Sequence, residues 1–160
     1  LRARLVEGMS EMDFPPKPPQ PAVLPPHLLE GLGVAPVYTG RNDSDYIVEI
    51  EDENALRDMK PNFSCLNQAD ARGVIVTARA HQGDYDFVSR FFAPQVGIPE
   101  DPVTGSAHCC LAPYWSGILK KDTFHAYQAS ARGGELWVRL SEGRVFIRGH
   151  AVTAYAAEMP

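Results

Sequence analysis

The sequence predicts an α+β domain in which one buried helix packs against a mostly antiparallel sheet. Residues 105–119 are apolar on nearly every face of a helix, so this segment should lie inside the fold. Around it lie short runs rich in β-branched and aromatic residues, which is the composition of strands. A chain of 160 residues is long enough to bury these elements in one domain.

Residues 1–36 are predicted to lead into a domain body at residues 37–160. The expected elements of the lead-in are an edge strand at 5–14, a proline-rich segment at 15–21 and a short helix at 27–32. The proline-rich segment lacks most of its amide donors and favours extended polyproline geometry. Such runs can be ligands of SH3-type domains, but the commoner role, and the one expected here, is that of a connector.

The body alternates strand-like and helix-like segments. Strands are expected at 45–50, 73–79, 86–92, 123–128, 135–140, 144–148 and 150–156. A short helix is expected at 53–59, ending before Pro61. The strands at 135–140 and 144–148 are separated by Ser-Glu-Gly, which predicts a β-hairpin with half-exposed strands.

The helix at 105–119 has one unusual feature, which is Pro113 in its interior. Proline removes an amide donor and clashes with the carbonyl four residues earlier, at Cys109. A kink is therefore expected near this point. Lys120 and Lys121 follow the helix, where their charge suits the negative end of the helix dipole.

The segment before this helix holds the best candidates for a functional site. Gly105 and Ser106 would present unpaired backbone amides at the first turn, and these favour a negatively charged ligand. Thr104 adds a hydroxyl donor, and Asp101 adds a carboxylate that can exchange a proton. This pattern suits a small carboxylate substrate. Asp101 or Thr104 could instead simply cap the helix, which is the commoner role of such residues.

Two further residues near the helix start have two interpretations each. His108 lies one helical turn after Thr104, so it could line the site as a proton shuttle or anion donor, or serve as a hydrogen-bonded structural histidine. Cys109 could be a nucleophile whose pKa the helix start lowers, although a small buried side chain is its more usual role. The turn at Arg132, Gly133 and Gly134 could contact an anion or merely lead into the hairpin.

Composition argues against several other functions. The net charge of −5 disfavours nucleic-acid binding, and no apolar run approaches the length of a membrane span or a signal core. Three cysteines without paired spacing, and five scattered histidines, predict neither a disulfide framework nor a metal site. A reducing cytoplasm is the expected compartment.

Several motifs resemble one family, the PhzF-like isomerases of the phenazine-biosynthesis type, including their eukaryotic phenazine biosynthesis-like domain proteins. Asp101 to His108 reads Asp-Pro-Val-Thr-Gly-Ser-Ala-His, preceded by Phe-Phe-Ala-Pro-Gln-Val-Gly at 91–97. Segments 132–136 and 143–149 are similar to the same relatives. Family members have two lobes of the diaminopimelate-epimerase type, each with a curved, barrel-like sheet around a central helix. This chain resembles the C-terminal lobe only.

The resemblance also implies a function and a partner. It implies an isomerase that moves protons by acid–base chemistry without a cofactor, with Asp101 and Ser106 as catalytic residues. The position of Thr104, Gly105 and His108 at the helix start makes them the expected substrate-binding residues. The family's principal acid–base group, a glutamate, lies in the other lobe, so pairing with an N-terminal lobe is expected and the chain alone should be inactive. A homodimer is a further expectation. The alternative is an inactive isomerase-like module with a binding or regulatory role.

Overall fold

The computed structural model describes residues 2–151 of the chain. Its elements are β1 (Arg2–Val6), β2 (Met9–Phe14), β3 (Gln20–Pro21), α1 (Pro26–Leu32), β4 (Pro36–Arg41), β5 (Asp45–Ile50), α2 (Glu53–Asp58), α3 (Phe63–Leu66), β6 (Gly73–Arg79), β7 (Phe87–Phe92), η1 (Pro94–Val96), α4 (Gly105–Leu119), β8 (Thr123–Gln128), β9 (Gly134–Ser141) and β10 (Arg144–Gly149). The strands form one ten-stranded sheet in the order β1-β2-β10-β9-β8-β7-β6-β5-β4-β3. Only the pairs β5–β6 and β7–β8 are parallel.

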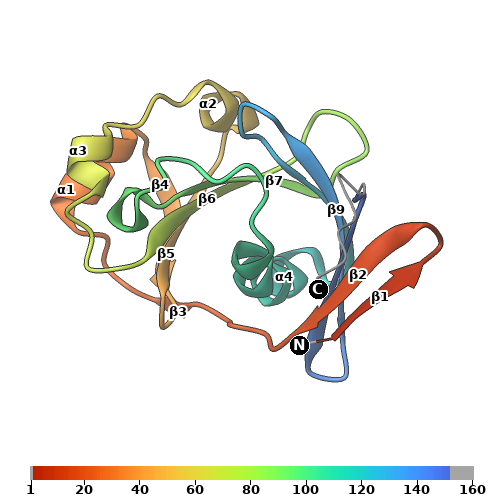
Figure 1. Cartoon of the computed structure of the whole chain (residues 1–160). Coiled ribbons are helices and arrows are strands. Elements are labelled where there is room, and N and C mark those ends of the chain that lie inside the picture. Colours follow the sequence, from red (N-terminus) through yellow and green to blue (C-terminus); the bar gives the residue numbers. More distant parts are fainter. Residues whose placement is uncertain (1, 152–160) are drawn as a thin grey trace, which may run out of the picture.

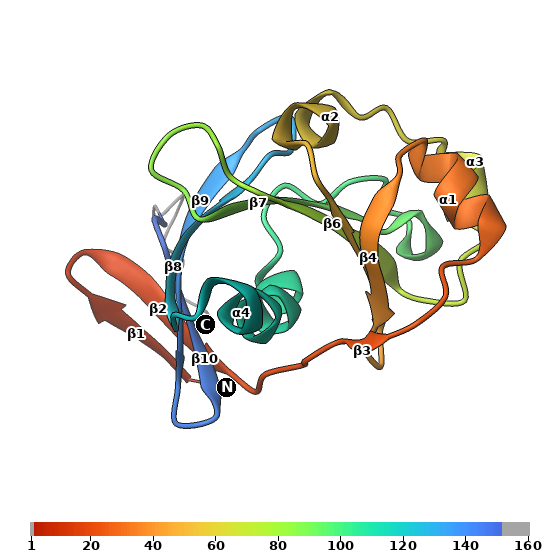
Figure 2. The ribbon, with the colours of Figure 1, turned by 180° about the vertical axis from the view of Figure 1, so that it is seen from behind.

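The sheet curls around α4, which lies in its hollow (Figures 1 and 2). The curl is not closed, because β1 and β3 end the sheet without pairing with each other. Helices α1, α2 and α3 lie on the opposite, outer face of the sheet (Figure 1). The predicted α+β fold with a curved, mostly antiparallel sheet around a central helix is therefore confirmed, as an open curl.

Two hydrophobic cores form, one on each face of the sheet. Strand β5 shows why, because its side chains alternate between the faces. Ile47 belongs to the inner core around α4, whereas Tyr46 and Val48 belong to the outer core under the short helices. Because both faces of this part of the sheet are covered, β5, β6 and β7 are buried along nearly their whole length.

Helix α4 is continuous across Pro113. Pro113 has no N–H that could donate to the carbonyl of Cys109. This carbonyl instead accepts a hydrogen bond of 2.8 Å from the backbone N–H of Lys17. Lys17 lies in the proline-rich segment, whose residues 15–19 have no regular structure and cross beside α4 (Figure 2). The segment therefore satisfies the backbone group that proline leaves free.

The same segment connects opposite ends of the sheet. Strand β2 pairs with β1 and β10 at one end, whereas β3 pairs with β4 at the other. Residues 15–19 bridge the open side of the curl between them (Figure 1). The predicted connector is thus a strap that passes over the buried helix. The division of the chain at residues 36 and 37 stays a prediction.

Most predicted elements are confirmed, and the differences have local causes. Residues 5–14 are not one strand, because Glu7 and Gly8 have positive φ angles and turn the chain into the β1–β2 hairpin. Strand β4 and helix α3 are not evident from the sequence. The predicted strand at 150–156 lies almost wholly outside the described residues.

Candidate functional site

The N-terminus of α4 is an uncapped helix end. Thr104 holds the N-cap position, but its side chain makes no capping hydrogen bond. The amides of Gly105 and Ser106 therefore lack the usual side-chain acceptor, and both residues are partly exposed. Such a helix end favours an anion, because its amides and its dipole both present positive charge. The capping role that the sequence allowed for Asp101 or Thr104 is not found.

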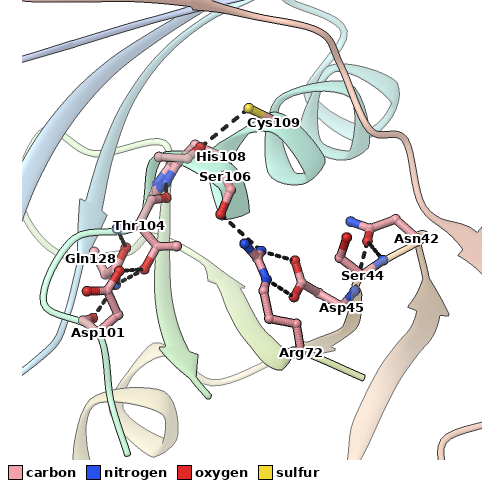
Figure 3. A network of polar contacts seen from close by, with 11 residues as sticks. Asn42, Ser44, Asp45, Arg72, Asp101, Thr104, Ser106, His108, Cys109 and Gln128 are labelled. Carbon is pink, nitrogen blue, oxygen red and sulfur yellow. Dashed lines mark hydrogen bonds and ion pairs between the residues drawn. The ribbon is translucent and has the colours of Figure 1, made fainter. Parts of the chain in front are cut away.

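Asp101 lies beside this helix end, on the loop that follows β7. Its backbone N–H donates a hydrogen bond of 3.0 Å to the carbonyl of Phe91, and its side chain is half-buried. One carboxylate oxygen, Oδ2, accepts a hydrogen bond from the hydroxyl of Thr104. Within residues 2–151 the other oxygen, Oδ1, accepts no hydrogen bond. The carboxylate lies beside Thr104 at the N-terminus of the helix (Figure 3).

Gln128, at the end of β8, fixes the loop that carries Asp101. Its side chain is fully buried. Its Oε1 accepts from the Thr104 N–H at 2.8 Å, and its Nε2 donates to the Asp101 carbonyl at 2.7 Å and to the Thr104 hydroxyl at 3.1 Å. Sequence reasoning missed this residue, because nothing in its local sequence distinguishes it from other strand glutamines.

Ser106 contacts a second group of polar residues, which sequence reasoning also missed. Its Oγ accepts a hydrogen bond of 3.0 Å from Nη2 of Arg72. The guanidinium of Arg72 also donates to Asp45, with Nε–Oδ1 at 2.9 Å and Nη2–Oδ2 at 2.5 Å. Asp101 and Arg72 thus lie on opposite sides of the α4 N-terminus, with Ser106 between them (Figure 3). Asp45, Arg72 and Ser106 are far apart in the sequence. The parallel pairing of β5 and β6 places Asp45 beside Arg72.

His108 is fully buried and does not reach the surface near Gly105. Its Nδ1–H donates to the Thr104 carbonyl at 2.8 Å, and its ring stacks on Phe87. Its Nε2 has no hydrogen-bond partner among the described residues. Burial lowers the pKa of His108 to about 4, so the ring is neutral at pH 7. This placement fits the structural interpretation of His108 and leaves it away from the partly exposed amides.

Cys109 is a buried thiol rather than an activated one. Its Sγ–H donates to the Gly105 carbonyl at 3.5 Å. Burial raises the pKa of this thiol to about 11, which outweighs the nearby positive charge of Lys17. Cys109 therefore remains protonated at pH 7, which fits the buried side chain that is its more usual role and not the alternative of a nucleophile.

A groove of about 630 Å³ begins at Gly105. Its walls include the apolar side chains of Val103 and Ile147, together with the turn at 132–134. The two glycines of that turn are required by packing: a side chain on Gly134 would collide with Val103, and one on Gly133 would collide with the hydroxyl of Tyr127. The glycines therefore bring the turn against the loop before α4, and Arg132 lines the groove.

Residues 2–151 offer neither of two other types of site. No group of three or more His, Cys, Asp or Glu side chains is placed to hold a metal ion in this part of the chain. No helix there is long and apolar enough to cross a membrane.

The open curled sheet around a central helix is a fold that this chain shares with solved structures. The crystal structure of a PhzF-family protein from Enterococcus faecalis superimposes with a TM-score of 0.87 at 38% identity, covering 92% of this chain and 56% of that one. A family model described as phenazine biosynthesis-like protein matches residues 29–157. The chain belongs to this phenazine biosynthesis-like (PhzC-PhzF) family.

Relatives by sequence include proteins named as isomerases. One from Halalkalibacterium halodurans, named an uncharacterized isomerase, is 53% identical over 150 residues, which cover 93% of this chain and 57% of that protein. The human phenazine biosynthesis-like domain-containing protein is 38% identical over 171 residues, covering 94% of this chain and 59% of that protein. The chain thus spans a little over half the length of these relatives.

Proposed function

We propose that this chain forms one lobe of an isomerase that acts on a small carboxylate by acid–base proton transfer, without a metal or organic cofactor. The observation that carries the proposal is the uncapped N-terminus of α4, with Asp101 beside it and Ser106 in its first turn. Family membership and the names of the relatives support the same reaction class.

Each group at the helix end has a role in this proposal. The amides of Gly105 and Ser106 bind the substrate carboxylate, as helix N-termini bind anions. The hydroxyl of Ser106 donates a hydrogen bond to a carboxylate oxygen. The groove beside Gly105 receives the apolar part of the substrate, and its volume lies in the range of small-molecule sites. Thr104 acts through Asp101, whose carboxylate it holds by its hydroxyl.

An isomerisation by proton transfer needs two groups. One group removes a proton from a substrate carbon, and another delivers a proton to a different carbon, so the substrate gains and loses one proton overall. Asp101 supplies one of these groups through Oδ1. The second group comes from another lobe in this proposal. His108 is fully buried and does not reach the helix end where the substrate would bind, so this proposal does not assign it the second role.

The experiment that tests this proposal is a proton-exchange assay on a chimera. The segment of the Halalkalibacterium halodurans relative that aligns with this chain is replaced by this chain, which keeps the remainder of that protein. Aliphatic and aryl-substituted carboxylates that carry a C–H bond on the carbon beside the carboxyl group are incubated in D₂O, and NMR follows deuterium incorporation at that carbon. We expect exchange by the chimera and none by the 160-residue chain alone.

Two variants give this assay its specificity. Asp101→Asn in the chimera should abolish exchange, whereas Asp122→Asn, an exposed acid bonded to Ser116 at the other end of α4, should not. Exchange that survives Asp101→Asn would refute the role of Asp101. Exchange by the lone chain that depends on Asp101 would refute the need for a second lobe. Carboxylate binding by the chimera with no exchange would favour an inactive binding module.

A cytoplasmic location is part of the proposal. It is supported by the three cysteines, which are free thiols in the structure, as expected in a reducing compartment.

A further inference from the structure

Arg72 is held rigidly at the last position before β6. Its backbone N–H donates to the carbonyl of Ser44 at 2.7 Å, and its guanidinium makes two hydrogen bonds to Asp45. Asp45 is almost fully buried, at 1% exposure, and the Asn42 side chain accepts from its N–H at 2.9 Å. The guanidinium carbon also lies 5.3 Å from the centre of the Phe91 ring. An arginine anchored in this way loses little conformational freedom when it binds a ligand.

The anchored guanidinium faces the proposed site rather than being enclosed by its partner. The side chain of Arg72 keeps 39% of its surface exposed, although that of Asp45 is buried. Its Nη2 serves both Asp45 and Ser106, whereas Nη1 makes no hydrogen bond within residues 2–151. The edge of the guanidinium that is turned away from Asp45 lies toward Ser106 (Figure 3). Two N–H groups at Nη1 are therefore available to an incoming anion.

The bond from Arg72 also determines what the Ser106 hydroxyl can do. Because the Oγ of Ser106 accepts a hydrogen bond from Nη2, its own O–H is directed elsewhere. Ser106 thus keeps its O–H available as a donor to a ligand. A neutral amide or an alcohol would gain less from such a set of donors than a carboxylate does, since charge-assisted hydrogen bonds are the stronger ones.

We infer that Arg72, anchored by Asp45, is a substrate-binding residue that makes this site selective for carboxylates, with Nη1 and the Ser106 hydroxyl as neighbouring donors. The inference rests on the proposed function, because it concerns the same site at the N-terminus of α4. It adds a fixed positive charge to the helix amides, and it assigns the negative charge of the ligand to the side of the helix opposite Asp101. The proton-transfer group and the charge-binding group are therefore separate.

The test compares a charged and a neutral ligand of the same shape. Benzoate and benzamide are titrated into the ¹⁵N-labelled chain, and NMR follows the amide signals of Gly105 and Ser106. The wild-type chain should bind benzoate in preference to benzamide. Arg72→Gln should weaken benzoate binding about tenfold or more while leaving benzamide binding nearly unchanged, as expected when hydrogen bonds to a charged ligand are lost.

Two further variants separate binding from folding. Arg72→Gln leaves a buried carboxylate without its partner, so Arg72→Gln/Asp45→Asn removes both charges and should fold while still losing the preference for benzoate. Arg41→Gln is the matched control, because Arg41 forms a similar ion pair with Asp70, with a comparably exposed side chain, and makes no hydrogen bond to α4. It should bind benzoate as the wild type does.

The outcomes distinguish this inference from the proposed function. If the wild type binds benzoate at Gly105 and Ser106 and the double variant keeps the same preference, Arg72 is not a substrate-binding residue and the proposed function stands. If benzoate does not perturb these amides in the wild type, both the inference and the carboxylate site fail. Loss of the preference in Arg41→Gln as well would show a general charge effect and would overturn the inference.

Discussion

Replacement of Gln128 by leucine tests whether a single buried amide holds the acid of the site in place. The side chain is fully buried and makes three hydrogen bonds, to the Thr104 N–H, the Thr104 hydroxyl and the Asp101 carbonyl. Leucine has a similar volume but can make none of them. The Thr104 N–H and hydroxyl, which are buried, would then lose partners that water cannot readily replace.

The expected cost follows from this geometry. A buried donor or acceptor that is left unsatisfied costs about 1–3 kcal/mol, and the Asp101 carbonyl, being partly exposed, should cost less than the two buried groups. We therefore expect Gln128→Leu to lower the free energy of unfolding by about 2–4 kcal/mol. For a chain of this size that corresponds to a fall in Tm of about 5–15 °C.

Urea denaturation followed by circular dichroism measures this change. Gln68→Leu is the matched control, because Gln68 is exposed and makes one hydrogen bond, to the carbonyl of Ser64. Its effect should stay within about 0.5 kcal/mol. A similarly small effect for Gln128→Leu would refute the reasoning, since it would show that the loop of Asp101 does not depend on this clamp.

Two further predictions concern α4. Burial lowers the pKa of His108 from 6.5 to about 4, so between these pH values the unfolded chain binds a proton more readily than the folded chain does. The free energy of unfolding should therefore be at its full value above about pH 6.5, and it should fall by about 3 kcal/mol as the pH drops to 4. Urea titrations across this range should show a flatter profile for His108→Leu but not for the exposed His81→Gln, and an unchanged slope in His108→Leu would contradict the assignment. Lys17→Pro removes the N–H that serves the Cys109 carbonyl and should cost about 1–3 kcal/mol, but clearly less in a Pro113→Ala background, where the helix supplies its own donor. Equal costs in the two backgrounds would show that the bond from Lys17 does not compensate for the proline.

The elements that could be predicted from the sequence are those whose own residues decide them. Helix α4 is apolar on most faces, and the β9–β10 hairpin has a Glu-Gly turn between alternating strands. Strand β4 was missed because it contains a proline and a glycine and lies near the sheet edge, where packing with β5 decides its structure. The curvature of the sheet came from the family resemblance and not from any local pattern.

The residues of the candidate site also divide into those that the sequence could group and those that only the fold brings together. Asp101, Thr104, Gly105 and Ser106 could be grouped from the sequence because they are close in the chain. Arg72 and Gln128 could not, because only the sheet brings β6 and β8 to the N-terminus of α4. His108 had two interpretations in the sequence, and its orientation into the core depends on packing against Phe87 that the local spacing does not reveal.

The strap at residues 15–19 has a consequence for how the lobe can vary. Strands β2 and β3 follow each other in the chain but occupy opposite ends of the sheet, so the length of the strap sets the distance between those ends. An extended proline-rich segment spans ~3.1 Å per residue and behaves as a stiff spacer. An insertion or deletion of even one residue there should widen or tighten the whole curl. It would thereby tilt the tip of the central helix relative to the strands that surround it.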